Sequence, residues 1–168
     1  EFRRVLFRSE HVQQNLIALD DEPLEKTIGE ILKRRGKTLG TAESCTGGYI
    51  AHLITSMPGS SSFYKGSVIS YANEVKKELL DVAEYDLETH GAVSEQVVIS
   101  MAKGLLQSIN TDYSIAVSGI MGPDGGSEEK PVGTVWIAVA DNNKTLARKF
   151  HFRFGRQKNI QKIGRAHV

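Results

Sequence analysis

Residues 41–48 have the sequence Thr-Ala-Glu-Ser-Cys-Thr-Gly-Gly, which gathers hydroxyl, thiol and glycine residues in one short segment. They follow a stretch at 38–42 that is predicted as a strand, and they precede an amphipathic stretch at 50–57 that is predicted as a helix. A glycine turn that enters a helix directs backbone N–H groups outward, where they bind anions or stabilise an oxyanion. An ordinary helix cap would have the same composition, so this loop alone leaves both interpretations open.

Ser44 and Cys45 are the two candidate nucleophiles in this loop. A thiol is the stronger nucleophile at neutral pH, whereas a serine hydroxyl needs a base. The five histidines are scattered along the chain, and none is suitably placed to serve as that base. Tyr71 and Lys76, in the segment Ser-Tyr-Ala-Asn-Glu-Val-Lys at 70–76, offer a substitute, because burial lowers the pKa of a lysine. Taken alone, a segment of this type more often contains a tyrosine at the end of a strand and a solvent-exposed lysine on a helix than a catalytic pair.

A second loop at 118–134 is long and rich in glycine, proline and charged residues. A simple hairpin needs only two to five residues, so a loop of this length favours a ligand-binding role over a plain connection. It lacks the Gly-Lys-Ser/Thr ending of a P-loop, and it does not match the Gly-x-Gly-x-x-Gly dinucleotide fingerprint.

The elements around these loops alternate between helices and short apolar strands. This alternation predicts a three-layer α/β/α sandwich with a mixed, mostly parallel sheet of about five strands. Both loops follow buried strands, which is where open α/β sheets bind ligands. Strands are expected at 38–42, 68–71, 114–117, 134–140 and 146–154; helices at 23–35, 50–57, 74–80 and 94–109 and from 158 onward; and an irregular turn at 87–90.

The length of 168 residues fits one domain with a sizeable core. No apolar run reaches the length of a membrane span, and the N-terminus lacks the pattern of a signal peptide. The one cysteine fits a reducing compartment, and we predict a cytoplasmic protein. Cysteine and histidine do not cluster at metal-ligand spacing, so no metal site is expected.

Residues 1–9 and 162–168 fit no periodicity in the chain beside them. One codon choice for 162–168 matches a common sequencing adapter, and its reverse complement in another frame encodes Arg-Val-Leu-Phe-Arg-Ser, the sequence at 4–9. We therefore predict that both ends are adapter-derived, that 10–22 is a linker or the tail of a missing upstream domain, and that 23–161 is the domain. Without the basic residues of these ends, the net charge changes from +1 to negative, which removes any prediction of nucleic-acid binding.

Together these segments resemble the CinA C-terminal domain, the nicotinamide-mononucleotide deamidase family. The resemblance covers 23–161 and rests on the two long loop motifs in their order, Ala-Glu-Ser-Cys-Thr-Gly-Gly and Ser-Gly-Ile-x-Gly-Pro-Asp-Gly-Gly-Ser-Glu-Glu-Lys-Pro-Val-Gly-Thr-Val. It implies an amidase of pyridine-nucleotide salvage (NAD metabolism), which converts nicotinamide mononucleotide to nicotinic acid mononucleotide and ammonia without a metal or organic cofactor.

The resemblance also implies site residues. Ser44 is the expected nucleophile and forms an acyl-enzyme, Lys76 and Tyr71 are the expected acid–base pair, and backbone N–H groups near 45–48 should hold the oxyanion. Cys45 stays open as the competing nucleophile. Arg156 matches the arginine that follows the last strand in the family, and its fork of donors would suit a phosphate. The predicted substrate-binding residues are Cys45, Thr46, Gly47, Gly48, Ser118, Gly119, Gly122 and Arg156.

The sequence departs from the family in two respects. A larger N-terminal domain, which resembles molybdopterin-binding proteins in two-domain members, is not present, although the native protein could carry it. The C-terminal helix of the family is cut after Gln161, which should expose apolar surface on one sheet face and lower stability.

Two alternatives to the enzyme stay open: a non-catalytic nucleotide-binding or regulatory domain, and a structural partner of an upstream module. The presence of Ser44, Tyr71 and Lys76 together favours the enzyme. The expected partner is a small nucleotide, not a nucleic acid or a membrane, and a homodimer is also compatible with the sequence.

Overall fold

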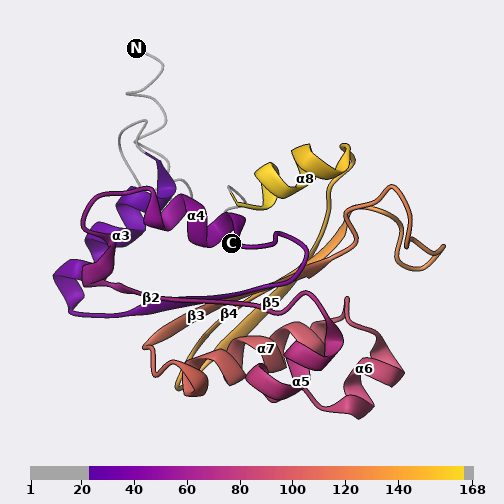
Figure 1. Cartoon of the computed structure of the whole chain (residues 1–168), viewed down its shortest axis with the longest axis horizontal. Coiled ribbons are helices and arrows are strands. Elements are labelled where there is room, and N and C mark those ends of the chain that lie inside the picture. Colours follow the sequence, from indigo (N-terminus) through magenta and orange to yellow (C-terminus); the bar gives the residue numbers. More distant parts are fainter. Residues whose placement is uncertain (1–22, 165–168) are drawn as a thin grey trace, which may run out of the picture.

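The computed structural model describes residues 23–164, whose helices and strands Figure 1 shows. Predictions for residues 1–22 and 165–168 concern parts of the chain outside this range. No helix within the described range is long and apolar enough to cross a membrane. The elements in chain order are α3 (Leu24–Arg35), β1 (Leu39–Glu43), α4 (Tyr49–Thr55), the 3-10 helix η1 (Ser60–Ser62), β2 (Tyr64–Ile69), α5 (Asn73–Leu80), α6 (Glu84–His90), α7 (Glu95–Ser108), β3 (Tyr113–Gly119), β4 (Thr134–Asp141), β5 (Thr145–His151) and α8 (Arg156–Ile163).

The strands described form one mixed sheet in the order β2-β1-β3-β4-β5. β1 lies parallel to both β2 and β3, whereas β4 runs against both of its neighbours. The carboxyl ends of β1, β2 and β3 therefore meet at one edge of the sheet. The predicted fold class is confirmed, since the sheet has five strands and helices cover both of its faces (Figure 1).

Helices α3, α4 and α8 cover one face of the sheet, and α5, α6 and α7 cover the other (Figure 1). α7 is the central helix of the second layer, because its apolar residues pack against small side chains of the strands, such as Ala116 and Ala138. Ser94 caps α7 by accepting a hydrogen bond from the Val97 amide at 3.4 Å, which matches the predicted cap.

Some local predictions were wrong. Residues 84–90 form the helix α6, in which Leu87 is the one buried residue, so apolar periodicity could not reveal it. β2 ends at Ile69, which places Tyr71 after the strand and not in it. β5 ends at His151, so the alternating phenylalanines run past the strand, and Phe154 is 46% exposed. Ile163 ends α8 with a buried side chain, and the adapter-derived origin of 162–168 stays a prediction.

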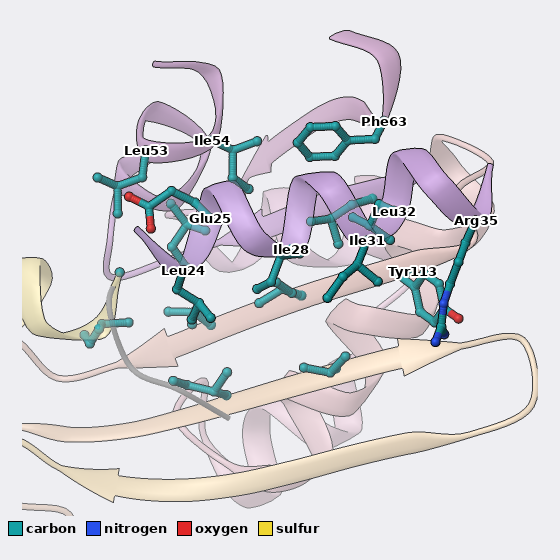
Figure 2. Close-up of a pocket in the computed structure, with 18 residues that line it drawn as sticks. Leu24, Glu25, Ile28, Ile31, Leu32, Arg35, Leu53, Ile54, Phe63 and Tyr113 are labelled. Carbon is teal, nitrogen blue, oxygen red and sulfur yellow. The ribbon is translucent and has the colours of Figure 1, made fainter. Parts of the chain in front are cut away.

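A hollow of about 430 Å³ lies between α3, α4 and the sheet (Figure 2). Its walls are almost entirely aliphatic and aromatic side chains, with Glu25 and Arg35 as the charged residues among them. The described residues that line it include no serine, cysteine or lysine. This hollow lacks the groups for the predicted amide chemistry.

The contact between α5 and α7 fixes the position of α5 and depends on Gly104. A Cβ atom at Gly104 would lie 1.9 Å from the backbone oxygen of Leu80. We expect Gly104→Ala to lower the free energy of unfolding by about 3 kcal/mol, because α5 and α7 would have to separate. Urea denaturation measures this. Lys103→Ala, at an exposed position of the same helix, is the control and should change the midpoint little.

Candidate active site

A second pocket, of about 210 Å³, lies at the edge where the carboxyl ends of β1, β2 and β3 meet. This is the edge at which open α/β sheets bind ligands. The pocket draws residues from the loop after β1, the segment from β2 into α5, the segment before α7, the end of β3 and the start of α8. Its lining residues are Ser44, Cys45, Tyr71, Asn73, Lys76, Ala92, Val93, Ser118, Gly119, Met121 and Arg156.

The loop after β1 is built around the side chain of Glu43, which is fully buried. One carboxylate oxygen accepts hydrogen bonds from the Thr46 hydroxyl at 2.7 Å and from the amides of Gly48 and Ile50 at 3.1 and 3.0 Å. The other accepts from the Ala51 amide at 2.7 Å and the Thr41 hydroxyl at 3.2 Å. The carboxylate thus neutralises the positive end of α4 from inside the protein.

Backbone N–H groups near 45–48 were predicted to hold an oxyanion, and two of them are bonded within the protein. The Gly48 amide is bound to Glu43, and the Gly47 amide donates to the carbonyl of Ser44 at 3.1 Å. The amides of Cys45 and Thr46 differ from these two, because no other described residue accepts a hydrogen bond from either of them. The carboxylate of Glu43, the residue before Ser44, occupies the anion-binding position that the glycine turn forms.

Ser44 and Cys45 differ in how they meet the pocket. Ser44 continues the β1–β3 ladder through its amide, which donates to the Val117 carbonyl at 3.0 Å. No described residue forms a hydrogen bond with its hydroxyl. The Cys45 side chain packs in an apolar cluster with Val117, Met121 and Val135, and burial raises the pKa of its thiol to about 12. The thiol is therefore protonated at neutral pH and a poor nucleophile.

Lys76 is 1% exposed, although it lies only one turn into α5. Its ammonium group donates to the carbonyls of Ser70 and Tyr71 at 2.8 and 3.3 Å, and it forms no ion pair with a carboxylate among residues 23–164. Burial lowers the pKa of Lys76. A lysine held by neutral carbonyls in this way is suited to accept a proton.

Tyr71 and Arg156 meet at the mouth of the pocket. The Tyr71 side chain is 62% exposed, and its hydroxyl accepts a hydrogen bond of 3.0 Å from Arg156 Nη2. Arg156 Nη1 donates to the Gly122 carbonyl, also at 3.0 Å. Neither bond neutralises the guanidinium, which makes no ion pair within the described part of the chain. The hydroxyl of Tyr71 is bonded here to Arg156 and not to Lys76, so the relay between Tyr71 and Lys76 stays a prediction.

Two hydrogen bonds attach the second loop, 118–134, to the segment between α6 and α7 and to the end of α6. The Ser118 hydroxyl donates to the Ala92 carbonyl at 2.7 Å, which joins the end of β3 to the segment before α7. Farther along, Lys130 donates to the carbonyl of His90 at the end of α6. These bonds keep the long loop against α6 and α7.

The structure brings most of the predicted site residues together. Ser44, Cys45, Tyr71, Lys76, Ser118, Gly119 and Arg156 all line the pocket, whereas Thr46, Gly47, Gly48 and Gly122 do not. Thr46 turns inward to Glu43, and Gly122 contributes the carbonyl that holds Arg156.

Sequence reasoning missed four lining residues: Asn73, Ala92, Val93 and Met121. Asn73 and Met121 lie inside the segments 70–76 and 118–134, so a prediction that took every residue of these segments would have included them. Ala92 and Val93 carried no chemical signal, because they are apolar residues of a short connection.

Comparison of the sequence with known protein families identifies relatives of this domain. The family profile described as the CinA C-terminal domain matches residues 21–167. This chain belongs to the CinA C-terminal domain family. The resemblance inferred from the two loop motifs is thereby confirmed.

Relatives in this family have different lengths. A CinA-like protein of Cytophaga hutchinsonii is 46% identical over 150 residues, which are 89% of this chain and 36% of that protein. A protein of Escherichia coli strain K12 named nicotinamide-nucleotide amidohydrolase PncC is 53% identical over 117 residues, which are 70% of this chain and 71% of that protein. The chain thus spans about a third of the longer relative.

Solved structures of the CinA superfamily share the fold. One from Escherichia coli superposes with a TM-score of 0.83 at 31% identity and covers 94% of both chains. A competence/damage inducible protein from Agrobacterium tumefaciens gives a TM-score of 0.82 at 37% identity, covering 84% of this chain and 87% of that one.

Proposed function

We propose that this chain is an amidohydrolase that converts nicotinamide mononucleotide to nicotinic acid mononucleotide and ammonia, with Ser44 as the nucleophile. One observation carries the proposal: Ser44 and the buried Lys76 line the same pocket, and Lys76 is held by carbonyls without a carboxylate partner among the described residues. The similarity to the Escherichia coli protein named nicotinamide-nucleotide amidohydrolase supports the choice of substrate.

In the proposed mechanism, neutral Lys76 removes the proton of the Ser44 hydroxyl as its oxygen attacks the carboxamide carbon. The carbon–nitrogen bond then breaks, Lys76 returns the proton to the leaving nitrogen, and ammonia departs. A water molecule, deprotonated by the same lysine, hydrolyses the resulting ester and regenerates Ser44 with nicotinic acid mononucleotide as product.

The negative oxygen of the tetrahedral intermediate needs hydrogen-bond donors. The Cys45 amide is our candidate, because Cys45 lines the pocket and no other described residue accepts from its amide, whereas the amides of Gly47, Gly48 and Ile50 are bonded within the protein. In other enzymes the loss of one such donor costs about 3–4 kcal/mol of transition-state stabilisation. Buried Cys45 then contributes its backbone and not its thiol.

The direct test is ammonia release from nicotinamide mononucleotide by the purified protein, with Ser44→Ala as the control. Release by the wild type and not by Ser44→Ala supports the proposal. Tight binding of the nucleotide without turnover would favour a non-catalytic nucleotide-binding domain. Mass spectrometry of the acid-quenched reaction tests the acyl-enzyme, which would add the mass of the nicotinoyl nucleotide to Ser44.

Arg156 is our candidate for binding the substrate phosphate, because its charge is not neutralised by another described side chain. We expect Arg156→Ala to raise KM about tenfold, the equivalent of 1.4 kcal/mol in binding, and to change kcat much less. Steady-state kinetics at low and high salt measure this. Added salt should raise KM of the wild type and leave that of the variant nearly unchanged. A fall in kcat with an unchanged KM would contradict the phosphate role.

A further inference from the structure

Glu43 has the most extensive set of hydrogen bonds to its side chain in the described chain, yet it does not line the pocket. Its carboxylate receives five donors and has no basic side chain as a partner among residues 23–164. Burial of a charge in this way costs free energy unless hydrogen bonds compensate for it. An apolar residue here would leave the Thr46 hydroxyl and the first amides of α4 without an acceptor, so the Glu43 carboxylate is the group that joins this loop to α4.

The five donors divide into two groups by position. Thr41, in β1, donates from the strand side of the carboxylate and also bonds to the Tyr64 hydroxyl at 2.6 Å. Thr46 and the amides at the start of α4 donate from the loop side. The loop-side bonds join the first turn of α4 to the end of β1, and Ser44 lies in the chain between them. The position of Ser44 is therefore fixed from both ends of its loop.

We propose that Glu43 is a positioning residue for the reaction. Its carboxylate holds the loop so that Ser44 lies at the pocket wall and no other described residue accepts a hydrogen bond from the Cys45 amide. The inference rests on the proposed amidohydrolase function, which it deepens by assigning the loop geometry to one side chain. Glu43 touches neither the pocket nor the reacting atoms, so it acts only through the loop.

The two threonines provide a matched pair for the test. Thr46→Val and Thr41→Val each remove one hydroxyl donor from the Glu43 carboxylate, one from each oxygen, and each replaces the residue by one of similar shape. Only Thr46 belongs to the loop that carries Ser44. We expect Thr46→Val to lower kcat about tenfold because the loop loses a restraint. Thr41→Val should leave both kcat and KM within about twofold of the wild type.

Glu43→Gln gives the larger effect. The NH2 group of a glutamine would face hydrogen-bond donors of the loop, so part of the hydrogen-bond network around residue 43 is lost. We expect kcat to fall about 100-fold or more, with a nearly unchanged KM. Rates are compared per folded molecule, at a temperature below the unfolding midpoint of every variant. If Glu43→Gln retains the wild-type kcat, or if both threonine variants lose activity by the same factor, the positioning role is overturned.

A second readout separates this inference from the identity of the substrate. A phosphonofluoridate probe reacts with an activated serine: Lys76 takes the hydroxyl proton, the oxygen of Ser44 bonds to phosphorus, and the phosphorus–fluorine bond breaks as fluoride leaves, which intact mass follows. Suppose that the wild type does not hydrolyse nicotinamide mononucleotide. The proposed function then fails, and the labelling rate decides the role of Glu43. Slower labelling in Thr46→Val than in Thr41→Val supports positioning; equal rates, or no labelling of the wild type, overturn it.

Discussion

Replacement of Ser44 by alanine should abolish amide hydrolysis, with a loss of kcat on the order of 10³-fold or more. The reason is chemical, because the attacking oxygen is removed and the neighbouring thiol does not replace it. The fold should be unaffected, since no described residue forms a hydrogen bond with the Ser44 hydroxyl. Ammonia release measures the activity, and a thermal unfolding curve measures the stability.

Cys45→Ala is the paired variant and should behave in the opposite way. Its kcat should stay within about threefold of the wild type, because a thiol with a pKa of about 12 contributes no thiolate at neutral pH. Stability should fall by about 1–2 kcal/mol, since the sulfur fills space beside Val117 and Met121. An inactive Cys45→Ala protein beside an active Ser44→Ala protein would assign the nucleophile to the thiol instead.

Lys76→Met should lower kcat by about 10²- to 10⁴-fold, the range that a general base contributes. Methionine keeps most of the apolar stem but cannot take a proton. We also expect the variants to differ from the wild type in the pH dependence of the reaction rate. The wild-type rate should rise with pH and level off above the pKa of Lys76, which lies below the ordinary lysine value because the group is buried. Lys76→Arg stays charged over this range and should show no such rise.

The stability of the same variants provides a check on burial. Because the pKa of Lys76 is lower in the folded protein than in the unfolded chain, charging this residue opposes folding. The penalty is full below the lowered pKa and disappears as the pH approaches the ordinary lysine value. Lys76→Met should thus gain stability relative to the wild type near neutral pH and lose this advantage in strongly basic solution. Denaturation midpoints at two pH values test the sign, and an advantage that grows with pH would contradict it.

The sequence by itself predicted the fold class, and together with the family resemblance it predicted most of the residues that line the pocket. Alternating helical and apolar strand segments imply the sandwich, and the carboxyl ends of parallel strands must share an edge. The loops at 41–48 and 118–134 were therefore expected at a ligand site, and Ser44, Lys76, Ser118 and Arg156 do line one pocket. α6 escaped detection because a helix with one buried residue has almost no apolar period.

Only the tertiary structure decided what each group in the loop can do. The sequence left Ser44 and Cys45 open as nucleophiles, because burial is a property of packing and not of residue type. The glycine turn resembled a cradle for an external anion, but Glu43 fills it from within. Likewise, the sequence alone could not distinguish a buried Lys76 from a solvated helix lysine, and its burial against carbonyls of the segment after β2 supports the predicted role as base. The free energy of a charged or nucleophilic group depends on its neighbours in space, and these come from elements that are distant in the chain.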